Sequence, residues 1–427
     1  MLKKQSIKLG RLIKKTMLMR GGGSALPGLV VEKINPHFLQ NALEGLPRGV
    51  VVVSGTNGKT TTTKIIVQLL RAQGLKVFTN PSGSNFTRGI VSSLLSHVDD
   101  DGKLDADIAV LELDEAHAVH FVRLVAPKYS LVLNVLRDQL DRFGEIDHTA
   151  KLLAEVVKKT SDGVVLNRDD ALVRQLASHV ERDKKLQYFG VAEDLLDFFP
   201  SDADMHGTRA EAAKLPHLNK NDVILEKLTG NKATFAFGDK ALKPVTLRLD
   251  GVYNVLNAAA ALALVRMICG DSAKADGLLD ELVDIKPAFG RGEAIEIDGQ
   301  PLEIVLVKNP SGFRLSLKSY ADRPATTMIA INDLYADGRD MSWLWDVDFT
   351  EMSSLNSPFV GGLRAYDMAL RLQYDEVEVG RIIPDVADCL NQFLADTKGP
   401  RRVYCTYTAM LALRRELAKN YKLEPIE

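Results

Sequence analysis

The chain has 427 residues, with 54 lysines and arginines against 56 acidic side chains and a formal net charge of −2. Hydrophobic residues make up 46% and charged residues 26% of it, which is typical of a globular protein and excludes a wholly disordered or fibrous chain. The near-neutral charge argues against a dedicated nucleic-acid-binding protein, and no run of about 18 apolar residues predicts a membrane span.

Residues 1–20 interleave basic and apolar side chains and contain no acid, so they predict an amphipathic helix. Its lysines interrupt the apolar core of roughly 7–15 residues that a secretory signal needs. Two interpretations stay open: the helix packs on the first domain, or it makes peripheral contact with an anionic membrane surface. The chain has 3 scattered cysteines, too few for a disulfide framework, so we expect a cytoplasmic protein, at the inner face of the membrane if the helix contacts lipid.

Short apolar runs alternate with helical patterns in the first half of the chain. Apolar runs at 50–53, 75–78, 108–111, 131–135 and 164–166 are predicted strands, and helical periodicity at 65–70 follows the first of them. This alternation predicts a mostly parallel, three-layer α/β sheet. Such sheets bind ligands at the carboxyl ends of their strands, so the polar groups there are the candidates for chemistry.

The second half predicts a further α/β unit. The pattern loosens between about 196 and 246, which we interpret as an insertion, and helical periodicity returns at 254–267. A boundary is expected at 287–292, before predicted strands at 302–307 and 328–331. We therefore expect three parts: a basic N-terminal helix and hinge (1–45), a central domain (46–292) and a C-terminal domain (293–427).

The sequence GTNGKTTTT at 55–63 lies between the first predicted strand and its helix. Glycines in such a loop let backbone N–H groups converge on phosphate oxygens at the helix N-terminus. Lys59 is predicted to reach the β- and γ-phosphates, and the Thr60 hydroxyl to face Mg²⁺. The general phosphate-loop pattern has a glycine where this chain has Val53, so the loop is a variant. The alternative interpretation is a tight glycine turn with an incidental lysine.

Residues 55–61 resemble the ATP loop of the Mur ligases and folylpolyglutamate synthases. Gly251–Asn254 with Asn257 is similar to that family's second nucleotide motif, in which an asparagine meets the adenine. Phe289–Glu293 resembles the segment whose arginine, here Arg291, contacts phosphate at the domain boundary. Further segments that are similar to the MurT branch of the family are 137–147, 308–312, 332–340 and 364–366, so that the resemblance extends over about residues 50–370.

The resemblance implies a fold and a reaction. The expected fold is α/β, with a P-loop-type parallel-sheet ATPase domain followed by a smaller Rossmann-like C-terminal domain. The implied reaction is the ATP-dependent amidation of the D-glutamate α-carboxylate of lipid II through an acyl phosphate, with ATP and Mg²⁺ as cofactors. The implied nucleotide-binding residues are Gly55, Thr56, Asn57, Gly58, Lys59, Thr60, Thr61, Asn257 and Arg291. Thr60 and Glu112, which ends a predicted strand, are the implied Mg²⁺ ligands, although a strand-end acid facing solvent is the plain alternative for Glu112.

Two positions depart from the wider family, and one segment departs from its MurT branch. Gln139 stands where many Mur ligases place a histidine for a second metal ion, and Lys308 where amino-acid-adding relatives usually carry a histidine before Asn-Pro. Both departures agree with the MurT branch. Proteins of that branch commonly carry a four-cysteine zinc ribbon near 200–230, but this segment contains no cysteine. We therefore predict no zinc.

The source of ammonia is expected to be a second protein. The cysteines of this chain lack the setting of a glutaminase nucleophile, and the resemblance implies a separate, GatD-like glutamine amidotransferase subunit. It also implies that an aspartate of this chain completes the partner's Cys–His pair by orienting the imidazole. Asp337 is the first candidate and Asp340 the second, and a turn or capping role is the alternative for each. Trp343 and Trp345 lie beside them as either interface anchors or core residues.

Two other functions compete with amidation. One is a stand-alone ligase that adds an amino acid or glutamate to a carboxylate, against which Gln139 and Lys308 argue. The other is a non-enzymatic nucleotide-binding subunit. The combination of Lys59 and Thr60 with Glu112 and Arg291 argues against it, because control of assembly needs no complete set of phosphoryl-transfer residues.

Overall fold

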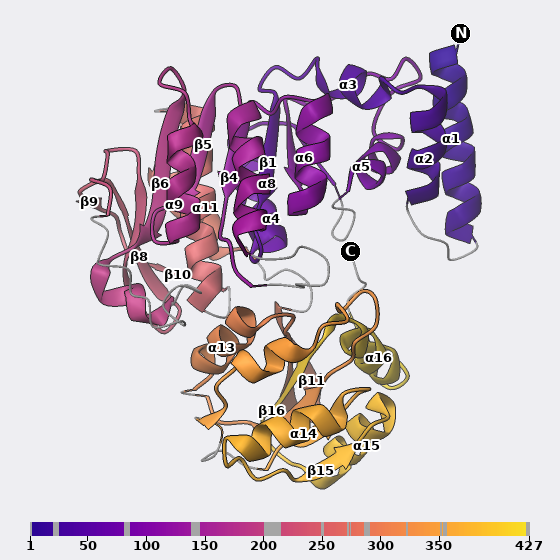
Figure 1. The fold of residues 1–427 in the computed structure, drawn as a ribbon, viewed down its shortest axis with the longest axis vertical. Helices are drawn as coiled ribbons and strands as arrows, with labels where there is room; N and C mark the ends of the chain where they lie inside the picture. Colours follow the sequence, from indigo (N-terminus) through magenta and orange to yellow (C-terminus); the bar gives the residue numbers. More distant parts are fainter. Residues whose placement is uncertain are drawn as a thin grey trace.

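The computed structural model contains two α/β bodies, one above the other in Figure 1, with the N-terminus on the larger body and the C-terminal chain forming the smaller one. It describes residues 2–19, 25–80, 86–137, 146–199, 215–248, 252–270, 273, 275–285, 291–321, 323–350, 352 and 357–423. Within these residues, no helix is long and apolar enough to cross a membrane.

The larger body is built on a sheet of 10 strands within the described residues, in the order β10-β8-β7-β6-β5-β4-β1-β3-β2 with β9 beside β8. The strands are β1 (Val50–Ser54), β2 (Val77–Thr79), β3 (Ile108–Glu112), β4 (Tyr129–Val132), β5 (Gly163–Asn167), β6 (Lys185–Val191), β7 (Val223–Thr229), β8 (Lys232–Phe237), β9 (Lys240–Ala241) and β10 (Val245–Thr246). Strands β1 to β7 run parallel to one another, which confirms the mostly parallel sheet predicted from the sequence.

Helices cover both faces of this sheet because its strands are apolar on both sides. Helices α4 (Lys59–Ala72), α11 (Val252–Cys269) and α12 (Ala275–Val283) form one layer, and α6 (Glu115–Leu124), α8 (Ile146–Lys159) and α9 (Ala171–Gln175) form the other. Along β1, Val51 and Val53 pack under the first layer, and Val50 and Val52 under the cluster on the opposite face. The result is the three-layer arrangement that the sequence predicted.

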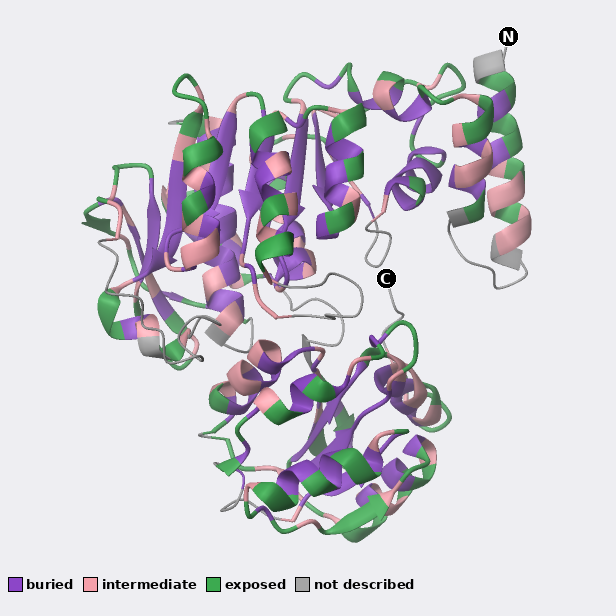
Figure 2. Cartoon of the chain, viewed as in Figure 1, coloured by how far each residue is buried: buried purple, intermediate pink, exposed green. Residues whose placement is uncertain are grey.

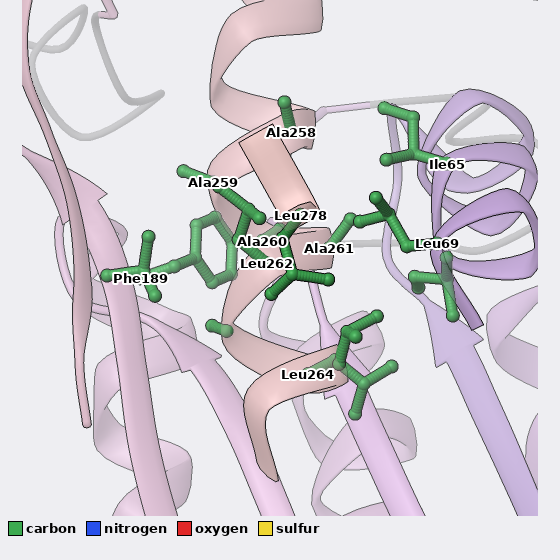
Figure 3. Packing of buried hydrophobic residues seen from close by; sticks show 14 of the residues in the cluster. Ile65, Leu69, Phe189, Ala258, Ala259, Ala260, Ala261, Leu262, Leu264 and Leu278 are labelled. Atoms are coloured by element: carbon green, nitrogen blue, oxygen red, sulfur yellow. The ribbon is translucent and has the colours of Figure 1, made fainter. Parts of the chain in front are cut away.

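Helix α11 lies at the centre of the first layer. Its residues 258–265 are all fully buried, as expected for a helix that is apolar all round. In Figure 3 they contact Ile65 and Leu69 of α4 on one side and Phe189 of β6 on the other. Because α4 begins at the phosphate loop, this packing fixes the loop relative to Asn257 at the start of α11.

The segment that we predicted to be an insertion adds strands to the main sheet. Strand β7 continues the parallel series beside β6, and β8, β9 and β10 follow as an antiparallel edge. The described part of the segment near 196–246 is therefore an extension of the main sheet, and 200–214 lie outside the described residues.

The N-terminal helices pack on the edge of the larger body (Figure 1). They are α1 (Leu2–Met19), α2 (Ala25–Ile34) and α3 (Phe38–Leu43), with α5 (Thr87–Leu94) beside them. Arg11 of α1 donates to the Leu95 carbonyl at 2.8 Å, and Lys14 donates to the Ser92 carbonyl at 2.8 Å. Part of the positive charge of α1 therefore serves packing, as in the first of the two interpretations. The predicted hinge at 20–24 lies outside the described residues.

The smaller body has a sheet of 6 strands within the described residues, ordered β11-β12-β16-β13-β14-β15. These are β11 (Arg291–Ile297), β12 (Gln300–Leu306), β13 (Thr326–Ala330), β14 (Phe359–Gly361), β15 (Arg381–Ile383) and β16 (Arg401–Cys405). The packing helices are α13 (Pro310–Ser319), the 3₁₀ helix η4 (Ser342–Asp346), α14 (Ala365–Tyr374), α15 (Val386–Asp396) and α16 (Tyr407–Leu417). All pairs except β11–β12 are parallel, which gives the predicted second α/β domain.

Candidate active site

The phosphate loop joins the end of β1 to the start of α4. Gly55 and Gly58 have φ angles of 127° and 88°, a region that residues with a Cβ rarely adopt. A Cβ on Gly58 would lie 2.4 Å from Oδ1 of Asn257. Glycine at this position therefore serves both the curl of the loop and its close approach to α11.

Lys59 lies inside the loop and only 8% of its surface is exposed. Its ammonium donates to the carbonyls of Gly55, at 2.5 Å, and Thr56, at 3.3 Å. Glu115, which is 4% exposed, lies 3.5 Å from the ammonium. Burial has the largest single effect and by itself would raise the pKa of Glu115, but the Lys59 ammonium, a backbone N–H and the Lys308 ammonium together outweigh it, and the pKa lies below its usual value. Glu115 is thus a carboxylate that neutralises the loop lysine, a role that the sequence did not reveal.

The two residues implied as Mg²⁺ ligands meet at the start of α4. The Thr60 hydroxyl donates to Oε1 of Glu112 at 2.9 Å. The Asn80 side chain accepts from the backbone N–H of Glu112 and donates to its carbonyl, both at 3.0 Å, which fixes the end of β3. A hydroxyl and a carboxylate oxygen side by side beside a phosphate loop fit the oxygen preference of Mg²⁺.

A cavity of about 160 Å³ lies between the two bodies next to the phosphate loop. Asn57, Gly58 and Asn257 form its side toward the loop, where Asn257 is only 7% exposed. The rest of its lining includes the apolar side chains Leu136, Phe199, Tyr253, Leu256, Leu306 and Leu315, and the polar side chains Asn134, Asn167, Asp169 and Asp170. An apolar cavity with a polar rim beside a phosphate loop is suited to the base and ribose of a nucleotide.

Asn134 is a site residue that sequence reasoning missed. Its Oδ1 accepts from the N–H of Asn57 at 2.8 Å, and its Nδ2 donates to the Asn57 carbonyl at 3.1 Å. The backbone carbonyl of Asn134 also accepts from the N–H of Thr56 at 3.0 Å. Its position just after β4, a strand adjacent to β1, was the available signal, because strand ends in a parallel sheet converge.

The C-terminal domain contacts the phosphate loop directly. Lys308 donates to the Thr56 carbonyl at 3.1 Å. Lys59 of the central domain donates to the same carbonyl, so one lysine from each domain binds this acceptor. Asn57 and Asn309 exchange a pair of amide hydrogen bonds of 3.1 and 2.9 Å. Asn309 also caps α13 by accepting from the N–H of Gly312 at 2.8 Å. The Lys308–Asn309 motif is therefore part of the site.

Asp337 and Asp340 lie between β13 and η4 in the C-terminal domain. Asp337 is buried, 3% exposed, and its carboxylate accepts from the N–H groups of Thr408 and Leu334 at 2.7 and 3.1 Å and from the Thr408 hydroxyl. Burial raises its pKa against the effect of these hydrogen bonds. Asp340 is half-buried, and its Oδ1 accepts from the N–H of Ser342 at 2.9 Å. Of the two acids, Asp340 is the more accessible to a partner.

Some predicted residues lie outside what the structure describes. Arg291 is the first residue of β11, but its side chain is not among the described ones, and Gln139 lies in the undescribed segment 138–145. The described residues contain no group of three or more His, Cys, Asp or Glu that could hold a metal ion. Because 200–214 are outside that search, the absence of zinc stays a prediction, which metal analysis of the purified protein would check.

Two family models match this chain. One, described as the Mur ligase middle domain, matches residues 53–265, and the other, described as the MurT ligase C-terminal, matches 306–410. The lipid II isoglutaminyl synthase (glutamine-hydrolyzing) subunit MurT of Streptococcus pneumoniae is 30% identical over 94% of this chain and 93% of its own length. The protein of the same name from Staphylococcus aureus strain COL is 28% identical over 98% of both chains.

Solved structures share the fold. MurF from Acinetobacter baumannii superposes with a TM-score of 0.68 at 16% identity, over 92% of this chain and 80% of that one. FolC from E. coli, in complex with DHPP and ADP, gives a TM-score of 0.63 at 15% identity, over 90% of this chain and 92% of that one. At such low identities the likeness establishes the fold alone, and it confirms the predicted fold class.

Proposed function

This chain belongs to the MurT family of Mur-type ligases, and from that membership we propose that it catalyses the ATP-dependent amidation of lipid II. The acceptor is the D-glutamate α-carboxylate, and the product is D-isoglutamine. One observation supports this assignment above the others: the phosphate loop and Lys308 of the second domain line one cavity, and the Thr60–Glu112 pair lies at the start of the helix that follows the loop. Together these residues would bind the nucleotide and the metal ion that activation of the acceptor carboxylate needs.

The proposed chemistry has two steps. A carboxylate oxygen of lipid II attacks the γ-phosphorus of ATP, the bond to the β-phosphate oxygen breaks, and ADP leaves. Ammonia then attacks the carbonyl carbon of the acyl phosphate, the bond between that carbon and the phosphate oxygen breaks, phosphate leaves with the electron pair, and the nitrogen loses a proton. Lys59 and the loop N–H groups neutralise charge on the transferred phosphoryl group. Mg²⁺ held by Thr60 and Glu112 would supply further positive charge to the phosphate oxygens.

We expect the purified chain, given Mg-ATP, lipid II and concentrated ammonium chloride, to release ADP and form the amide. Product mass, showing OH replaced by NH₂, is the measurement. If the assay is repeated with amino acids in place of ammonium, a product that carries an added amino acid would instead support the stand-alone ligase. The absence of ADP release with lipid II, with and without a glutaminase partner, would contradict the proposal.

The proposed partner is a GatD-like glutaminase that docks on the C-terminal domain. Exposed aromatic and leucine side chains lie on α14, on η4 and in the loops beside them: Leu334, Tyr335, Trp345, Leu363, Tyr366, Leu370 and Tyr374. Tyr335 is 86% and Tyr374 is 71% exposed, and Trp345 stacks edge-on against Tyr374. Figure 2 shows the exposed face of α14, the helix labelled in Figure 1. Clusters of exposed aromatic side chains are typical of protein interfaces.

Within this surface, we propose that Asp340 completes the partner's catalytic triad. The sequence motif placed Asp337 first, but Asp337 is buried and its carboxylate already accepts three hydrogen bonds from Thr408 and Leu334. Asp340 uses only Oδ1 for the N–H of Ser342, so its other oxygen is available to a partner's imidazole. Asp337 in this proposal holds the loop in shape.

The proposed location is the inner face of the membrane, where a lipid-linked acceptor is held. On α1, Lys8, Leu9, Leu12 and Lys15 share the outward face, and Leu12 is 62% exposed. Exposed leucines flanked by lysines fit the interface of an anionic bilayer. The chain is expected to sediment with phosphatidylglycerol vesicles and not with phosphatidylcholine vesicles. The double variant Leu12→Ser, Lys8→Glu should no longer sediment with phosphatidylglycerol vesicles. Lys33→Glu on α2 is the control and should sediment like the wild type. Unchanged sedimentation of the double variant would contradict the proposal.

A further inference from the structure

Two lysine side chains from different domains meet at one carbonyl of the phosphate loop. Lys59 comes from α4 of the central domain and Lys308 from the segment before α13. Both ammonium groups donate to the Thr56 carbonyl, at 3.3 and 3.1 Å. Two cations that share an acceptor lie within a few ångströms of each other, and like charges repel at that separation. An anion must therefore offset them.

Glu115 is that anion in the present structure. Its carboxylate lies 3.5 Å from the Lys59 ammonium, and both side chains are almost fully buried. The charge of Lys308 also lowers the pKa of Glu115, as the charge of Lys59 does. Two ammonium groups from different domains therefore gather with one carboxylate at the loop that is expected to bind phosphates.

We propose that Lys308 is a catalytic residue of the ligation, a second cation that contacts the γ-phosphoryl group of ATP. Glu115 occupies the position between the lysines until the phosphate arrives. The inference rests on the ATP-dependent reaction proposed above and assigns a role to a position where amino-acid-adding relatives have a different residue. Lys308 belongs to the C-terminal domain, so its contact would make phosphoryl transfer depend on the closed arrangement of the two domains.

The neighbouring contacts place Lys308 for this role. Asn309, the next residue, exchanges two amide hydrogen bonds with Asn57 in the loop. Asn309 is fully buried and caps α13, so the backbone beside Lys308 is held at the loop from both directions. A charged group on a fixed backbone loses little freedom when it engages a ligand, which favours electrostatic stabilisation of a transition state.

The test compares nucleotides that differ in the γ-phosphate. Calorimetric titration of the full chain with Mg²⁺ and either ADP or the non-hydrolysable analogue β,γ-imido-ATP measures each affinity. Lys308→Met is expected to lower the affinity for the analogue by about 10- to 100-fold, which is the effect of losing one charge-assisted hydrogen bond. Its affinity for ADP should be unchanged. Lys308→Arg should recover part of the loss. Lys318→Met, on the exposed face of α13, is the matched control and should bind both nucleotides like the wild type.

Glu115→Gln provides an independent measurement. Removing the competing carboxylate should tighten binding of the analogue and lower the melting temperature of the nucleotide-free chain, because the two ammonium groups then lose their counter-charge. The inference would be overturned if Lys308→Met lowered the affinities for ADP and for the analogue equally, or lowered neither. It would also be overturned if Glu115→Gln bound the analogue more weakly than the wild type. If the wild type binds neither nucleotide, the ATP-dependent function itself fails; if it binds both and only the Lys308 result is negative, the function stands without this role.

Discussion

Replacing Lys59 with methionine is expected to reduce amide formation by roughly 100- to 1,000-fold, with ammonium or with glutamine as the nitrogen source. Methionine keeps most of the length of the side chain and removes its charge. Lys59 is buried in the loop between Gly55 and Glu115, where a cation faces any phosphate bound at the start of α4. Because activation of the carboxylate precedes attack by ammonia, both nitrogen sources should fail together. ADP release and product mass are the measurements.

This variant needs a control for folding, because it removes the ion-pair partner of the buried Glu115 carboxylate. Breaking a buried ion pair by removing one partner commonly costs about 3–5 kcal/mol. The double variant Lys59→Met, Glu115→Gln removes both charges and should recover much of the melting temperature while staying inactive. Lys64→Met, further along α4 and half-exposed, should be active. A folded Lys59→Met chain that still forms amide at the wild-type rate would show that this loop is not the ATP site.

The parts of the site that the sequence predicted are those encoded by local patterns. A buried apolar run followed by a glycine-rich loop and a helical period specifies β1, the loop and α4, because strand, turn and helix each depend on neighbouring residues. Glu112 ends an apolar strand, where polar side chains are candidates for chemistry, and the resemblance to the Mur ligases implied its Mg²⁺ role. The strand-end rule needs no knowledge of which strands are neighbours.

The parts that the sequence did not predict depend on pairing between distant segments. The Asn57–Asn309 and Lys308–Thr56 contacts each join residues 252 positions apart. Neither hydrophobic periodicity nor turn-forming residues predict such a contact, because it depends on how the two domains pack against each other. Glu115 was left without a role for the same reason, because an acid at the start of a helix is most simply a favourable charge for the helix dipole.

The segment near 196–246 illustrates a different limit. Its Pro, Asp and Lys content led us to predict an insertion, but β7 to β10 are paired at one end of the main sheet. Edge strands have one side without a paired neighbour and commonly carry charged residues there, which weakens the alternating pattern. Composition is therefore a poor guide to sheet membership at an edge.

Replacing Asp340 with asparagine is expected to abolish glutamine-dependent amidation by the complex with its glutaminase partner and to leave ammonium-dependent amidation intact. Asparagine keeps the shape and can still accept from the N–H of Ser342, but it cannot stabilise a charged imidazole in the partner. The effect is expected to be large, about 10,000-fold on glutamine hydrolysis by analogy with loss of the acid from a catalytic triad. Glutamate release and amide formation, measured separately, distinguish the two activities.

Asp348→Asn is the matched control, because Asp348 is an exposed acid of the same region that accepts from the N–H of Thr350. It should retain both activities. Asp337→Asn should lower the melting temperature of the isolated chain, since a buried carboxylate with three internal donors is replaced, whereas Asp340→Asn should not. If Asp340→Asn keeps glutamine hydrolysis and Asp337→Asn loses it while the complex still forms, the triad acid is Asp337, and the buried loop must open when the partner binds.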